Sequence, residues 1–150
     1  MNFITQNCQK EVVLNTASFK DAMSLKKAAM KSILESNMRG GIDIADFKTA
    51  EISKILDIIA HAIVNADTSD EFEAAVFKCL ERSHYDKKQI NAQLFDDFPE
   101  AREDYYELIV KCCEVNLRPF FKSLVSELKT RLETMMKKDP EQKSQQTLSE

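Results

Sequence analysis

The sequence predicts an all-α protein, a single compact domain of about five or six helices. Its 150 residues are about one domain long, and a chain of this size buries roughly 68 to 70% of its unfolded surface. Hydrophobic residues make up 43% of the chain, which is enough for a core. Only two glycines and three prolines are present, so the turns that a many-stranded sheet needs are scarce.

Residues 1–138 are predicted to form this helical domain and residues 139–150 a disordered tail. The tail carries one aliphatic residue, Leu148, and cannot offset the entropy of ordering. At the other end, residues 1–17 mix apolar and polar side chains at no clean period. Either one short strand or an extended arm fits them.

The first helix is expected from Phe19 to Ser36. Ser18 stands three residues before Asp21, a weak variant of the capping box. The glycine pair at residues 40–41 ends the helix, because glycine tolerates the left-handed backbone beyond a helix C-terminus. Its apolar stripe follows mainly three- and four-residue steps: Phe19, Ala22, Met23, Met30, Ile33 and Leu34.

Two more helices follow. The first spans about Phe47 to Asn65 and is apolar on a wide face, as expected of a central helix. The second opens with the capping box formed by Thr68 and Glu71 and stops near Ser83. Its predicted core residues are Phe72, Ala75, Val76, Cys79 and Leu80.

The segment from Tyr85 to Phe98 is predicted as a loop plus a short helix started by Asn91. Pro99 then suits the first turn of a long helix, which Pro119 ends because proline disfavours helical geometry at the residue before it. A last helix from about Pro119 carries a clean stripe of Phe121, Leu124, Val125, Leu128, Leu132 and Met135.

We find no catalytic motif and expect no cofactor and no metal. The two histidines, His61 and His84, belong to no spaced zinc pattern, and the four cysteines are expected to be reduced, buried thiols. Five carboxylates near Pro99 are explained by a solvated face that complements a helix dipole: Asp96, Asp97, Glu100, Glu103 and Asp104.

The net charge of -4 argues against a duplex-binding surface, so we expect no nucleic-acid partner. Lys26, Lys27 and Lys31 form a basic face on the first helix, which keeps one alternative open: a small helical regulator or adaptor that binds nucleic acid or a host protein. No run of residues approaches the ~18 apolar residues of a membrane span, and the start lacks a signal-peptide pattern. We therefore expect no membrane association and a protein that stays inside the cell.

Partner-binding anchors are predicted from two adjacent aromatic pairs. Neighbours on a helix point about 100° apart, so one ring of each pair faces the core. The stripes place Tyr105 and Phe121 inward, which leaves Tyr106 and Phe120 as exposed anchors. Met136, beside the stripe residue Met135, is the third predicted anchor.

With these residues in view, the chain resembles the tail assembly chaperones of long-tailed bacteriophages and prophages. The resemblance spans about Ser18 to Leu124 and rests on three passages: SFKDAMSLKKAAMKSIL, EFEAAVFKCLERSHYDKKQI and AREDYYELIVKCCEVNLRPFFKSL. It implies a non-catalytic protein of the infected host's cytoplasm that is absent from the mature virion. The implied partners are the tape measure protein and the tail tube protein, with self-association as a further expectation.

Overall fold

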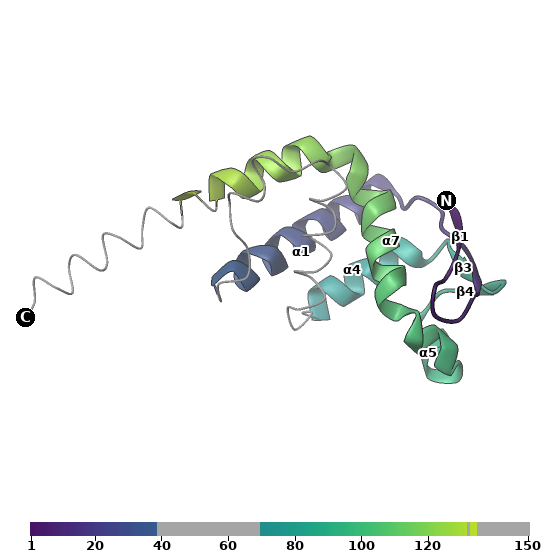
Figure 1. The fold of residues 1–150 in the computed structure, drawn as a ribbon. Helices are drawn as coiled ribbons and strands as arrows, with labels where there is room; N and C mark the ends of the chain where they lie inside the picture. The colour runs from purple at the N-terminus through teal and green to yellow at the C-terminus, as the bar shows by residue number, and fades with distance from the viewer. Residues whose placement is uncertain (39–69, 132, 135–150) are drawn as a thin grey trace, which may run out of the picture.

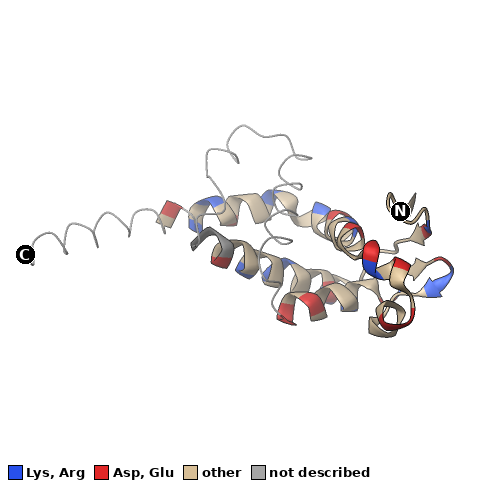
Figure 2. Ribbon diagram, turned by 60° about the horizontal axis from the view of Figure 1, so that its bottom comes forward, with Lys and Arg blue, Asp and Glu red and all other residues tan. Residues whose placement is uncertain are grey.

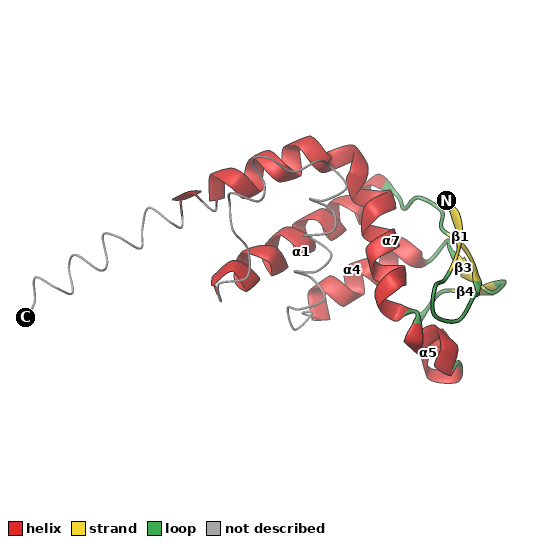
Figure 3. Ribbon diagram, viewed as in Figure 1, coloured by secondary structure: helices red, strands yellow, loops and turns green. Residues whose placement is uncertain are grey.

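The computed structural model describes residues 1–38, 70–131 and 133–134. Helices form most of this part of the chain, and a small antiparallel sheet lies at one end (Figure 1 and Figure 3). The predicted all-α class is therefore correct for the bulk of the fold and wrong in omitting the sheet. The expected helix over residues 47–65, the cap at Thr68, and the tail after residue 138 lie outside the described residues.

Three helices build the core. Helix α1 (Phe19–Met38) packs on α4 (Asp70–Leu80), and both pack on α7 (Tyr105–Leu117). Residues 121–131 form a further helix that lies alongside α1 (Figure 1). The predicted stripe residues of α4 are all buried, and those of the last helix up to residue 131 are buried or half-buried.

The capping prediction at the start of α1 is confirmed. The Ser18 hydroxyl accepts a hydrogen bond from the Asp21 N–H at 3.2 Å. This bond satisfies one of the amide donors that a helix N-terminus leaves without an intrahelical partner.

The sheet has four short strands in the order β1-β2-β3-β4, all antiparallel. Their bounds are β1 (Asn2–Ile4), β2 (Glu11–Val13), β3 (His84–Tyr85) and β4 (Lys88–Gln89). Val12 lies opposite Phe3 on one side and opposite Tyr85 on the other. Val12 and Tyr85 are buried against the helices, so the sheet closes one end of the core.

The turns of the sheet contain no glycine, the residue type that usually marks such turns in a sequence. Asp86 (φ 47°) and Lys87 (φ 65°) both adopt left-handed backbone in the two-residue connection between β3 and β4, as a type I′ hairpin turn requires. Gln9 (φ 55°) does the same before β2. The Asp86 carboxylate lies 3.7 Å from the ammonium groups of Lys10 and Lys88.

The region after the sheet follows the sequence prediction up to residue 103. Helix α5 (Ala92–Asp97) begins at Asn91, whose side-chain oxygen accepts the Leu94 N–H at 3.0 Å. Helix α6 (Pro99–Glu103) has Pro99 in its first turn. The prediction of one helix from Pro99 to Pro119 is wrong. This segment forms α6, α7 (Tyr105–Leu117) and the short 3-10 helix η1 (Arg118–Phe120).

The structure also corrects the prediction for Asp104, which lies between α6 and α7. The sequence predicts this residue on a solvated face, but it is fully buried, and its carboxylate accepts a 2.7 Å hydrogen bond from the Tyr85 hydroxyl. Its other oxygen has no hydrogen-bond partner in the described part of the chain. Burial, together with the Asp104 carboxylate, raises the pKa of Tyr85. The four other carboxylates of the cluster are exposed, as predicted.

The turn between β1 and β2 also contacts α6 and α7. The Gln6 N–H donates to the Glu107 carboxylate at 2.9 Å, and the Asn7 amide donates to the Glu103 carbonyl at 3.0 Å. The N-terminal arm is thus a hairpin attached to the same helices that Tyr85 contacts.

Asn116 fixes the segment that leads into α1. Its buried side chain accepts the Ala17 N–H at 2.9 Å and donates to the Cys112 carbonyl at 2.9 Å. Both groups of its amide are therefore used, which is how a buried amide avoids a desolvation penalty.

Three of the four cysteines, Cys79, Cys112 and Cys113, are buried free thiols, as predicted. Burial raises the pKa of the Cys113 thiol to about 12. Cys8, also expected to be buried, is only half-buried because it lies on the β1–β2 turn. Loss of solvation and a 3.3 Å hydrogen bond to the Glu103 carboxylate raise the pKa of Cys8 to about 11. These two thiols remain protonated at neutral pH.

We expect Asn116→Ala to lower the free energy of unfolding by about 1–3 kcal/mol, because the Ala17 N–H loses its partner. Urea denaturation monitored by circular dichroism measures this. Asn7→Ala is the matched control, since it removes a hydrogen bond at an exposed site and should cost less than about 0.5 kcal/mol. Equal losses for both variants would contradict the assigned role of Asn116.

Tyr85→Phe should lower stability by about 1.5–3 kcal/mol at pH 8, because the buried Asp104 carboxylate loses the 2.7 Å hydrogen bond from the Tyr85 hydroxyl. Since folding raises the pKa of Tyr85, its contribution is complete below about pH 10 and is lost as pH rises further. The stability difference between the native protein and the variant should therefore shrink above pH 10, by roughly 1.4 kcal/mol per pH unit. A difference that stays constant from pH 8 to pH 11 would show that Tyr85 is not coupled to folding in this way.

Candidate functional site

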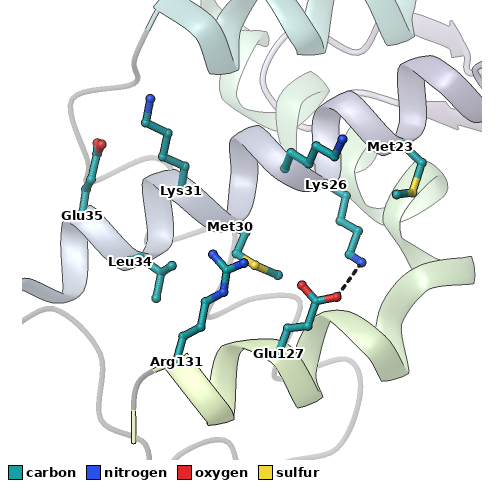
Figure 4. Close-up of a pocket in the computed structure, with 9 residues that line it drawn as sticks. Met23, Lys26, Met30, Lys31, Leu34, Glu35, Glu127 and Arg131 are labelled. Atoms are coloured by element: carbon teal, nitrogen blue, oxygen red, sulfur yellow. Dashed lines mark hydrogen bonds and ion pairs between the residues drawn. The ribbon is translucent and has the colours of Figure 1, made fainter. Parts of the chain in front are cut away.

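The candidate site is a groove between α1 and the helix at residues 121–131, with a volume of about 460 Å³ (Figure 4). Two elements far apart in the sequence form its walls. Its described lining residues are Met23, Lys26, Lys27, Met30, Lys31, Leu34, Glu35, Glu127 and Arg131.

The apolar part of the groove comes from one edge of α1. Leu25, Ala29 and Ile33 are fully buried in the core, which orients the rest of the helix. Met23 and Leu34 are left half-buried at the edge of that stripe, and Met30 is buried beneath the groove. The unbranched methionine side chains adapt to different surfaces, which suits a site for more than one apolar segment.

Lys26 connects the two walls of the groove. Its ammonium group lies 3.2 Å from the Glu127 carboxylate and 3.4 Å from the Ser123 hydroxyl, as the dashed line in Figure 4 shows for Glu127. The Lys26 side chain is only 11% exposed, so its aliphatic stem is covered while its charge is paired. This contact holds residues 121–131 at a defined distance from α1.

The remaining charges of the groove are mainly positive. Lys31 pairs with Glu71 of α4 at 3.0 Å, and that hydrogen bond raises the pKa of Lys31. Lys27 and Arg131 have no ion-pair partner within the described ranges. Figure 2 shows basic segments on α1 and on residues 121–131, with acidic segments at the start of α4.

The three lysines of the predicted basic face, Lys26, Lys27 and Lys31, therefore do not act as one free cationic surface. Lys26 is buried and paired, and Lys31 is paired across to α4. The alternative reading as a nucleic-acid or host-protein adaptor gains no specific support from this arrangement. It stays a prediction.

Of the three predicted anchors, Tyr106 and Phe120 lie in the described part of the chain, and neither lines the groove. Tyr106 is 55% exposed on α7, and Phe120 in η1 is half-buried, with its ring 5.8 Å from that of Phe19. Met136 lies outside the described residues. Of the two rings predicted to face inward, Phe121 is buried and Tyr105 is half-buried. The partner-binding role of all three anchors remains a prediction.

A row of aromatic rings that the sequence analysis missed runs through α4, α5 and α7. Ring centroids are 5.7 Å apart for Phe77 and Phe95, 5.3 Å for Phe95 and Tyr105, and 5.5 Å for Tyr105 and Tyr106. Burial raises the pKa of Tyr105. The edge-on geometry is that of rings stabilising one another, so Tyr106 extends a packed row to the surface.

The described residues include no assembled metal site. His84 is exposed on β3 while Cys79 and Cys112 are buried, so these three do not converge. Across residues 1–38 and 70–134, apart from residue 132, no group of three histidine, cysteine or carboxylate side chains is placed to hold an ion. His61 lies outside those ranges.

Among the helices that the structure describes, none has the length and apolar character needed to cross a bilayer.

Comparison with known proteins identifies the family. A family model described as phage tail assembly chaperone protein, TAC, matches residues 10–133. No curated protein and no solved structure shows significant similarity to the chain. The match covers both walls of the groove, the sheet from residue 10 onward, and all the helices described above. The chain therefore belongs to the phage tail assembly chaperone family.

Proposed function

We propose that this protein binds apolar helical segments of the tape measure protein during tail assembly, and helps tail tube subunits gather around that client. It acts by covering surface and changes no covalent bond. The observation that carries this proposal is the groove between α1 and residues 121–131, in a chain whose family consists of tail assembly chaperones.

The dimensions of the groove suit a helix. Met23 and Leu34 are eleven positions apart on α1, which corresponds to roughly 16 Å at about 1.5 Å per residue. A client helix laid along this distance would offer about three turns, with apolar side chains at three- and four-residue steps. Met30 lies between the two ends, so the apolar floor extends along the groove.

The chaperone must leave the tape measure protein when the tail tube forms around it, so its binding must be reversible. A groove with two half-buried apolar residues and exposed charges gives a weak site, so tight binding of the whole client requires many copies along it. Self-association of the chaperone would add to this effect. We also propose that the protein acts in the host cytoplasm during assembly and is absent from the mature virion.

The direct test is co-expression of the full chain with the tape measure protein of the same phage or prophage. We expect the long chain to be soluble and to co-purify with this protein, because its apolar helices are covered. If the tape measure protein is equally soluble and unbound with or without this chain, the proposed function is wrong.

A variant test assigns the binding to the groove. Met23→Glu combined with Leu34→Glu should reduce the co-purified tape measure protein at least about tenfold, because charged groups resist burial under an apolar helix. Phe19→Glu is the control: it introduces one such carboxylate on α1, at a 73% exposed apolar residue outside the groove, and is compared with each single substitution as well as with the double variant. Unchanged thermal melting confirms that each variant folds. Equal retention by the double variant and the control would exclude the groove as the binding site.

A further inference from the structure

We infer that the helix received by the groove is acidic as well as amphipathic, with carboxylates beside its apolar face. This inference rests on the proposed function and specifies the client's chemistry. Lys27 and Arg131 would meet those carboxylates, while Met23, Met30 and Leu34 cover the apolar face.

The charge of the groove is opposite to that of the chain as a whole. Its lining contains four cationic side chains and two carboxylates, on a protein with net charge -4. The Lys26 charge is compensated by Glu127, and the Lys31 charge by Glu71. This leaves Lys27, Arg131 and Glu35 as the lining charges without an ion pair in the described part of the chain.

The two cations that lack an ion pair among the described residues lie on opposite walls. Lys27 is on α1 and Arg131 is at the end of helix 121–131, where Figure 4 shows its guanidinium reaching towards α1 and Leu34 pointing back towards it. A helix between the walls would therefore contact a cation on each flank of its apolar stripe. Arginine adds a planar fork of donors that matches a carboxylate.

An acidic helix explains this lining better than a nucleic acid does. Duplex binding normally uses many lysine and arginine contacts to phosphates, whereas two of the four cations here are already paired within the protein. The methionine and leucine floor also offers nothing to a phosphate backbone, but it matches the apolar stripe of a helix.

Two labelled peptides of about 18 residues test the inference against the full-length chain. Both carry leucine at three- and four-residue steps, and their flanking positions are glutamate in one and lysine in the other. Fluorescence anisotropy at about 50 mM salt should show the acidic peptide binding at least about tenfold more tightly than the basic one. Raising the salt to about 500 mM should remove most of this preference.

The variant Lys27→Glu with Arg131→Glu should abolish or reverse the preference, while Lys122→Glu should leave it unchanged. Lys122 is exposed on the same helix as Arg131 but does not line the groove. Equal binding of both peptides, a preference that survives the double reversal, or stronger binding of a DNA duplex would overturn the inference.

A second copy of the chain as the occupant would also overturn the inference. Sedimentation of the unmixed protein would then show a dimer that the double reversal dissociates. These outcomes are separate from failure of the proposed function: if the tape measure protein still co-purifies with the double-reversal variant, the chaperone role stands and only the charge preference is wrong.

Discussion

Burial of one face of α1 is the constraint on which the rest of the structure depends. Leu25, Ala29 and Ile33 are fully buried against the core that α4 and α7 share with α1. Burying a leucine or isoleucine side chain contributes roughly 1.5–3 kcal/mol. This packing fixes the rotation of α1, and so leaves Met23 and Leu34 at the edge of the covered surface, where residues 121–131 form the second wall of a groove.

Most helix positions could be predicted because their signals are local. The Ser18 and Asn91 caps and Pro99 each act on the backbone within a few residues, and each lies where a helix begins. The sheet could not be predicted in the same way. Its turns place Gln9, Asp86 and Lys87 at positive φ, and residues of these types give no turn signal comparable to Asn-Gly or Asp-Gly.

Asp104 shows the limit of local reasoning about charge. The acidic residues around it led to the expectation of a solvated face, and for Asp96, Asp97, Glu100 and Glu103 that was correct. Asp104 differs because it is buried and accepts a hydrogen bond from the Tyr85 hydroxyl. Tyr85 is 19 residues earlier in the chain, on a strand that the sequence did not predict. Similarly, the stripe of α1 was recognised as apolar, but only the position of residues 121–131 and the Lys26–Glu127 contact make its edge a groove.

The central claim is that the groove between α1 and residues 121–131 is the surface that covers a client helix. Methyl NMR of the methionine-labelled chain, with and without a tape measure fragment, tests it most directly. The account predicts that the Met23 and Met30 methyl signals shift on binding, while Met1, 46% exposed and outside the groove lining, does not. Binding that leaves Met23 and Met30 unchanged would contradict it.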